Sequence, residues 1–164
     1  MKKSKARLAA LFFIAVYLLS VVAIQIAAPD QIIDPSDFPE KCPEDSLNCS
    51  IVSPYSHRSG GLMELRFNSN LETVMLEVNE WIDSNPRTEI IGEWTNQTHS
   101  VFKSLMFRFP DDFVVSGFCD NNQTVIYVYS QSRLGISDIG VNKDRVTSFA
   151  MHMKEVEMPT SECF

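Results

Sequence analysis

The spacing of apolar and polar residues divides the chain into an N-terminal apolar run and a longer region with short-range periodicity. The apolar run, residues 8–28, has no charged residue, and Ser20 and Gln25 are its most polar members. A membrane-spanning helix needs about 20 apolar residues, whereas the apolar core of a signal peptide has about 7–15. We therefore predict a retained transmembrane helix over residues 8–28. A long, cleaved signal peptide is the alternative.

The next segment, residues 29–60, shows little periodicity and contains five of the eight prolines together with many Ser and Asp residues. Proline and small polar residues interrupt regular elements and favour turns and extended chain. We predict a linker that continues as an arm around two cysteines.

A helical period begins at about residue 70. Apolar residues recur at one-turn spacing and form a single face: Leu71, Val74, Met75, Val78 and Ile82. Ser69 and Glu72 have the spacing of a capping box, and Asn85-Pro86 is a stop signal. This pattern predicts an amphipathic helix that ends before Pro86.

From residue 88 the period changes to two, which is typical of strands. The expected strands cover residues 88–94, 100–109, 113–119 and 124–130, with a weaker candidate at 62–67. A second helix is expected to begin near Asn142, a good N-cap residue, and to end before Pro159. Short connections join antiparallel neighbours. The prediction is an α+β domain over residues 61–158, a two-layer sandwich of a four- or five-stranded antiparallel sheet with two amphipathic helices, followed by a tail at 159–164.

Charge is distributed unevenly between the two ends of the apolar run. Four of the 14 Lys and Arg residues lie in residues 1–7, and no acidic residue occurs before Asp30. The rest of the chain has 10 basic residues against 21 acidic ones, which argues against nucleic acid as a partner. Positive flanks mark the cytoplasmic side of a membrane helix. We expect residues 1–7 in the cytoplasm and the domain outside it, whether periplasmic, luminal or extracellular.

Four cysteines in an exported domain favour disulfide bonds. Cys42 with Cys49 is the preferred pair because it closes a short loop, and Cys119 with Cys163 would then hold the C-terminal tail. Free thiols are the alternative. No two cysteines have the spacing of a zinc site, so neither a metal nor a cofactor is expected.

Two polar segments are candidates for chemistry. Asp111 and Asp112 are adjacent carboxylates that could hold a cation or provide a base. The structural alternative is an Asp-rich turn with an arginine partner.

The second segment runs from Ser130 to Arg145 and combines Gly, Arg, Asp and Asn at a strand-to-helix turn. Free N–H groups at such a helix N-terminus suit a phosphate or carboxylate, with Arg133, Lys143 and Arg145 adding positive charge. The structural alternative is that Arg133 pairs with Asp111, Asp112 or Asp138. The hypothetical ligand-binding set is Asp111, Asp112, Arg133, Ser137, Asp138, Asn142 and Arg145.

These segments resemble the family called domain of unknown function 1499. Three motifs carry the resemblance, over about residues 41–155: Cys42-Pro43 through Asn48-Cys49-Ser50, then Phe109-Pro110-Asp111-Asp112, then Ser130-Gln131-Ser132-Arg133, Gly135, Ser137-Asp138, Gly140, Asn142 and Arg145. Tyr129 stands where the family has an arginine, which weakens the idea of a two-arginine anion clamp, and Leu47 stands where a proline is usual. The family has no established activity to transfer.

The sequence thus predicts a membrane-anchored extracytoplasmic domain. The preferred hypothesis is a non-enzymatic binding or scaffold module for a partner protein or a small anionic or lipidic ligand. One alternative is a hydrolase that uses Asp111, Asp112 or Asp138 with Arg133 as an electrostatic stabiliser. Another is that the motif has a purely structural role.

Overall fold

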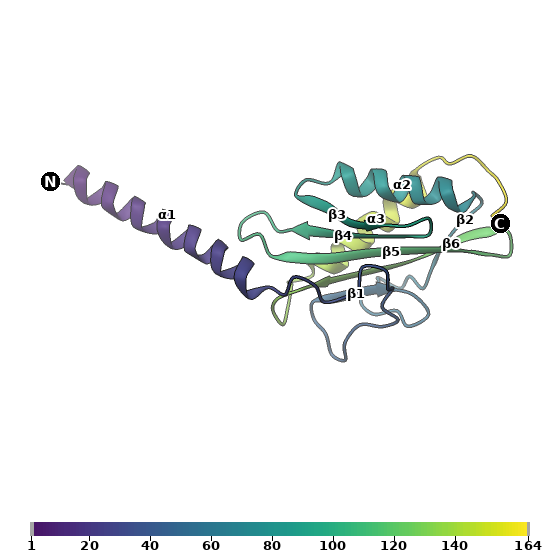
Figure 1. Cartoon of the computed structure of the whole chain (residues 1–164), viewed down its shortest axis with the longest axis horizontal. Coiled ribbons are helices and arrows are strands. Elements are labelled where there is room, and N and C mark those ends of the chain that lie inside the picture. Colours follow the sequence, from purple (N-terminus) through teal and green to yellow (C-terminus); the bar gives the residue numbers. More distant parts are fainter. Residues whose placement is uncertain (1, 164) are drawn as a thin grey trace.

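The computed structural model describes residues 2–163 and shows a long N-terminal helix that projects from the sheet and helices formed by the rest of the chain (Figure 1). The elements in chain order are α1 (Lys2–Ala27), β1 (Cys49–Val52), β2 (Leu65–Phe67), α2 (Leu71–Ser84), β3 (Thr88–Glu93), β4 (Gln97–Lys103), β5 (Pro110–Asp120), β6 (Gln123–Ser132) and α3 (Val141–Glu155). Residues 5–27 of α1 have a mean hydropathy of 2.5 and none of them is buried, so this helix is long and apolar enough to cross a membrane.

The sheet has six antiparallel strands in the order β1-β6-β5-β4-β3, and β2 also pairs with β6. β1 lies along residues 128–131 of β6 and β2 along residues 124–126, so these two short strands share one edge. The long hairpin of β5 and β6 forms the centre of the sheet. The predicted α+β class with an antiparallel sheet is confirmed, with six strands instead of four or five.

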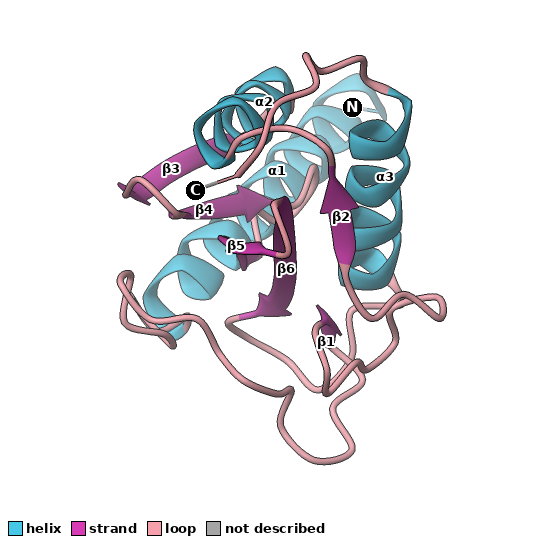
Figure 2. Ribbon diagram, turned by 90° about the vertical axis from the view of Figure 1, so that its right-hand side faces the viewer, coloured by secondary structure: helices cyan, strands magenta, loops and turns pink. Residues whose placement is uncertain are grey.

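One face of the sheet packs against α2 and α3 and contains the main hydrophobic core (Figure 2). Trp81 of α2 lies 5.5 Å from Phe113 of β5 and 5.0 Å from Phe149 of α3, measured between ring centroids. Aromatic rings at such edge-to-face and tilted geometries add to the stabilisation from burial. The two helices are therefore held to the sheet, and to each other, through shared aromatic contacts.

The opposite face is covered by residues 29–60, which we call the arm. Cys42 and Cys49 are buried here with Val114 and Tyr129, and Ile33 and Phe38 of the arm pack against them. Gln97 donates a hydrogen bond to the carbonyl of Pro35, at 3.1 Å. The segment expected to be a linker that continues as an arm around two cysteines is thus a packed layer, and it contributes β1 to the sheet.

The disulfides Cys42–Cys49 and Cys119–Cys163 are both present, in the preferred arrangement. The first closes the arm onto itself beside β1. The second joins the C-terminal segment to β5, close to the β5–β6 turn.

Both helix starts differ from the sequence-based expectation. The N-cap of α2 is Asn70, whose side chain accepts from the N–H of Thr73, and Ser69 makes no capping bond within the described chain. The N-cap position of α3 is Gly140, with a left-handed φ of 91°, while Asn142 is buried inside the first turn. The expected strand over 100–109 ends at Lys103, because residues 104–109 form the β4–β5 loop.

Candidate functional site

Asp111 and Asp112 point to opposite faces of the sheet. They are neighbours on β5, and successive side chains of a strand alternate between its two faces. Asp112 shares the arm face with Val114, and Asp111 shares the helix face with Phe113. The two adjacent carboxylates therefore cannot hold one cation between them, and each has a separate set of partners.

On the arm face, Asp112 is fully buried and has two partners. Arg133 donates to it twice, through Nε at 2.9 Å and Nη2 at 2.7 Å, in a bidentate pair. The Nε2 atom of buried His99 lies 2.7 Å from the same carboxylate. Burial raises the pKa of Asp112, but the hydrogen bonds from His99 and Arg133 outweigh this effect, and the pKa lies below its usual value. Asp112 is thus held as a buried carboxylate.

On the helix face, buried Asp111 pairs with Arg145 of α3, with 2.7 Å between Oδ2 and Nη2. The guanidinium of Arg145 also lies over the ring of Phe102, 4.6 Å from its centroid. A cation over an aromatic face is attracted to the negative face of the ring. This pair therefore attaches α3 to the end of the sheet.

Asn142 connects three segments that are distant in the sequence. Its amide nitrogen donates to the carbonyl of Asn48 at 2.9 Å and to the hydroxyl of Ser132 at 3.0 Å. Its amide oxygen accepts from the hydroxyl of Ser130 at 2.6 Å and from Arg145. Asn48, in turn, donates to the carbonyl of Gly135 at 2.6 Å. The side chain thus ties α3 to β6 and to the arm.

Asp138 caps α3. Its two carboxylate oxygens accept from the N–H groups of Gly140, at 2.9 Å, and Asn142, at 2.6 Å. Arg58 of the arm lies 3.5 Å away. Burial raises the pKa of Asp138, but these backbone hydrogen bonds outweigh it and lower the pKa. The anion at this helix N-terminus is therefore the protein's own carboxylate, as in the structural alternative to a ligand site.

The seven predicted site residues thus fall into separate groups. Arg133 pairs with Asp112 on the arm face. Asp111, Arg145, Asn142 and Asp138 form a second, connected group, because Arg145 contacts both Asp111 and Asn142, and the N–H of Asn142 donates to Asp138. Ser137 is exposed in the β6–α3 loop. Sequence reasoning missed His99, Asn48 and Arg58. Asn48 lies inside the first family-like motif, which was the available signal, whereas no local pattern distinguished His99. Among the described residues, no group of three or more His, Cys, Asp or Glu side chains is placed to hold a metal ion.

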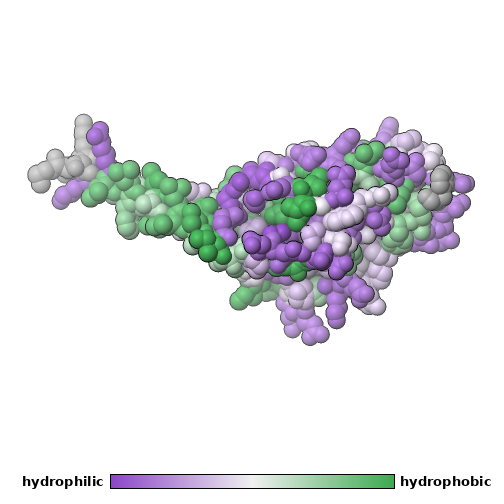
Figure 3. Space-filling model, in the orientation of Figure 1, coloured by the Kyte–Doolittle hydropathy of each residue, from purple (hydrophilic) through white to green (hydrophobic). Residues whose placement is uncertain are grey.

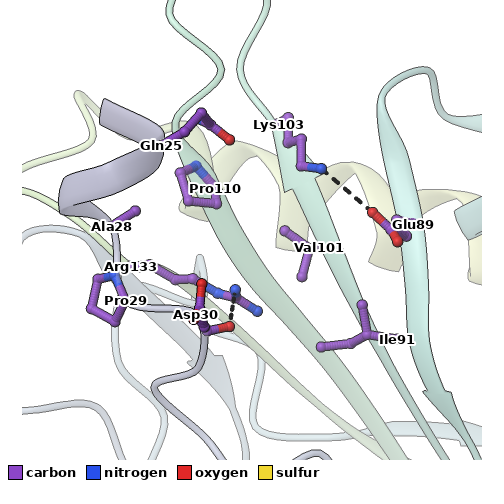
Figure 4. A pocket seen from close by; sticks show the side chains of 10 residues that line it. All are labelled: Gln25, Ala28, Pro29, Asp30, Glu89, Ile91, Val101, Lys103, Pro110 and Arg133. Carbon is purple, nitrogen blue, oxygen red and sulfur yellow. Dashed lines mark hydrogen bonds and ion pairs between the residues drawn. The ribbon is translucent and has the colours of Figure 1, made fainter. Parts of the chain in front are cut away.

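A cavity of about 340 Å³, which we call the exit cavity, lies where α1 meets the domain (Figure 4). It is lined by Gln25, Ala28, Pro29, Asp30, Glu89, Ile91, Val101, Lys103, Pro110 and Arg133. Lys103 Nζ lies 3.4 Å from Glu89, and Arg133 donates to the carbonyl of Asp30 on the opposite side of the cavity. The cavity thus contains two ion-paired cationic side chains, Lys103 and Arg133, together with acidic Asp30 and Glu89 and apolar Ile91 and Val101.

Comparison with protein families matches residues 28–153 to the family described as "Protein of unknown function (DUF1499)". The chain belongs to the DUF1499 family. The matched region comprises the arm, the sheet and almost all of α3. No curated protein matches the chain. Among solved structures, that of TTHA0849 from Thermus thermophilus is similar at 10% identity, with a TM-score of 0.28, over 54% of this chain and 84% of the other.

Tyr129 is the residue that the sequence motif predicted to weaken an anion clamp of two arginines. Its ring is buried on the arm face beside the Cys42–Cys49 disulfide, and its hydroxyl hydrogen-bonds to Gln131. Burial raises the pKa of Tyr129, so its hydroxyl stays neutral. A neutral phenol at this site contributes no positive charge to the arm face.

Proposed function

We propose that this DUF1499 protein is a non-enzymatic, membrane-anchored extracytoplasmic module that binds a small anionic or lipidic ligand in the exit cavity. α1 spans the bilayer with residues 1–7 on the cytoplasmic side, and the domain lies on the other side. The observation that carries the proposal is the position of the cavity. It opens beside Gln25, Ala28 and Pro29, where the apolar helix ends and the headgroup region of a bilayer would begin.

The cavity suits an anionic headgroup in size and lining. Its volume of about 340 Å³ lies within the range of small-molecule sites, about 300–1,000 Å³. Lys103 pairs with Glu89 at 3.4 Å, and because Glu89 is well exposed this ion pair is weak and a ligand can compete with it. Arg133 is fixed by Asp112 and presents a further N–H edge toward Asp30. The weakly paired Lys103 would attract an anion, and the fixed Arg133 would orient it.

The hydrolase alternative lacks this support. A catalytic base must reach the proton that it removes. Asp112 and Asp111 are buried in ion pairs, and Asp138 accepts two backbone hydrogen bonds. These contacts favour a structural role for the three aspartates, which hold the layers together. The proposed ligand site is therefore the exit cavity.

The test is the melting temperature of the full-length protein in neutral detergent, with short-chain phosphatidylglycerol, short-chain phosphatidylcholine or glycerol 3-phosphate added. The phosphatidylglycerol is expected to raise the melting temperature, because a ligand at 100 times its Kd stabilises the folded state by about 2.7 kcal/mol. Phosphatidylcholine has the lipid chains without the net negative charge, and glycerol 3-phosphate has the negative charge without the chains. Their effects therefore show which of the two features the cavity binds.

Lys103→Gln should reduce this shift, because it removes one cation and leaves the rest of the cavity unchanged. Lys154→Gln is the matched control, because Lys154 is an exposed lysine on α3, outside the cavity. The proposal fails if neither phosphatidylglycerol nor glycerol 3-phosphate shifts the melting temperature. It also fails if Lys103→Gln and Lys154→Gln respond alike.

A further inference from the structure

The β4–β5 loop, residues 104–109, has an apolar tip that the domain does not bury. Leu105 is 72% exposed and Met106 62% exposed, and Phe107 is also exposed. Turns between antiparallel strands are normally built from Gly, Asn, Asp, Pro and Ser. Three consecutive large apolar residues at a loop tip therefore indicate a surface that another apolar medium covers.

This tip lies against α1. The hydroxyl of Tyr17 donates to the carbonyl of Met106 at 2.7 Å, and the Tyr17 ring lies 6.0 Å from that of Phe107. The side-chain amide of Gln25 donates to the carbonyl of Arg108 at 2.8 Å. Two polar residues of the apolar helix are thus used to satisfy carbonyl groups of the loop.

Those contacts have the form that a lipid environment requires. In hydrocarbon, water cannot hydrogen-bond to a free backbone carbonyl, so a non-helical segment persists there only where protein groups satisfy it. Both helix partners lie in the last 11 residues of α1, which cover about 15 Å, half of a hydrocarbon core of about 30 Å. The loop therefore lies at the depth of the outer leaflet if α1 crosses the bilayer.

The β6–α3 loop, residues 133–140, extends the same end of the domain. Ile136 is 86% exposed and Ile139 97% exposed. Ser104 and Phe109 line one small cavity together with Leu134 and Gly135, so the two loops are neighbours. Figure 3 shows the hydrophobic surface of α1, and hydrophilic and hydrophobic residues are mixed at the adjoining end of the domain.

The ionisable groups of the two loops also fit a bilayer surface. The β4–β5 loop has Arg108 as its ionisable residue. The β6–α3 loop has Arg133 and Asp138, which are engaged in the ion pair with Asp112 and in the α3 cap, and exposed Lys143 follows on α3. Cations beside an apolar tip are attracted to anionic headgroups.

We infer that Leu105, Met106 and Phe107, with Ile136 and Ile139, form a second membrane contact that inserts into the outer leaflet beside α1 and fixes the orientation of the domain on the bilayer. The contact rests on the proposed membrane anchoring by α1. It also places the mouth of the exit cavity at the membrane surface.

The experiment uses the full-length protein reconstituted in phosphatidylcholine–phosphatidylglycerol vesicles, with tryptophan as a probe of depth. Met106→Trp introduces the probe at the loop tip. Met151→Trp is the matched control, because Met151 is also a methionine, 56% exposed, on α3. Wild-type protein gives the emission of Trp81 and Trp94, and flotation of the vesicles tests anchoring by α1 separately.

The added emission of Met106→Trp should be blue-shifted and largely lost in vesicles that contain brominated lipid, whereas Met151→Trp should keep its added emission. Ile139→Trp should behave like Met106→Trp. If the protein floats with the vesicles and Met106→Trp is quenched no more than Met151→Trp, the inference is wrong. Quenching at Met106 without quenching at Ile139 would exclude the β6–α3 loop from the contact. Failure to float would instead contradict the anchoring on which the proposed function rests.

Discussion

The two faces of the sheet each bury one aspartate–arginine pair, and the pairs differ in what they connect. On the arm face, Asp112 has two side-chain partners, Arg133 and His99, and Arg133 continues to the carbonyl of Asp30 just after α1. On the helix face, Asp111 has Arg145 as its partner, and Arg145 continues to Ser130 and Asn142. The first pair thus links the sheet to the segment that follows α1, and the second links it to α3.

This difference shows how one short motif can hold three layers. Because neighbouring residues on β5 face opposite ways, a single Asp-Asp step places one carboxylate against each layer. Buried ion pairs give little net stability compared with apolar contacts. Removal of one partner nevertheless destabilises the fold strongly, because a buried charge is left without a partner. The pairs therefore specify which layer packs where, and the aromatic core supplies most of the favourable burial.

The largest effect is expected for Arg145→Ala. Asp111 would stay buried without the one side chain that donates to it in the described structure, so the free energy of unfolding should fall by about 3–5 kcal/mol in denaturant titrations. Hydrogen exchange should accelerate in α3 more than in the arm. Arg66→Ala is the control, because Arg66 also forms two ion pairs but lies on the surface, where such pairs contribute little. Equal losses of unfolding free energy for the two variants would show that burial of the Asp111–Arg145 pair does not increase the cost of breaking it.

A smaller loss is expected for Arg133→Ala. His99 would still bond to Asp112, so the cost should be that of a partly satisfied buried group, roughly 1–3 kcal/mol. Hydrogen exchange should now accelerate in the arm, residues 29–60, because the contact with Asp30 is lost. Faster exchange in α3 with no change in the arm would contradict the assignment of one pair to each layer.

Local sequence patterns predicted the elements whose burial is periodic, and missed those whose burial depends on distant partners. The face of α2 was visible because Val74, Met75, Val78 and Ile82 repeat at one-turn spacing. β1 has four residues within a proline-rich arm, and it forms a strand because β6, about 80 residues later, pairs with it. The apolar run Leu105-Met106-Phe107 resembled a strand, although it is an exposed loop tip.

The same limit applies to the site. Asn142 is a residue type that often caps helices, so the sequence indicates that role. Its actual partners, Ser130, Ser132 and Asn48, are distant in the sequence and are brought to it only by the fold. His99 lies on β4, and register alone places it beside Asp112. By contrast, the opposition of Asp111 and Asp112 follows from strand alternation and was predictable once β5 was known to begin at Pro110.

The smallest effect is expected at Asp138, where an arm residue, Arg58, meets the N-terminus of α3. Asp138→Ala removes both acceptors of the cap, and the free energy of unfolding at pH 7 should fall by about 1 kcal/mol. Asp138→Asn should lose less, because one acceptor oxygen is kept. Asp144→Asn, in the exposed first turn of α3, should change stability by a few tenths of a kcal/mol through the helix dipole.

The pH dependence tests the charge on this cap. The pKa of Asp138 is lower in the folded state than in the unfolded chain, so its carboxylate stabilises the fold above an ordinary aspartate pKa of about 4, and the stabilisation is lost as the pH falls below that value. The difference in unfolding free energy between wild type and Asp138→Ala should therefore be present at pH 7 and shrink on acidification toward pH 3. A difference that persists unchanged in acid would mean that Asp138 acts by packing and not through its charge.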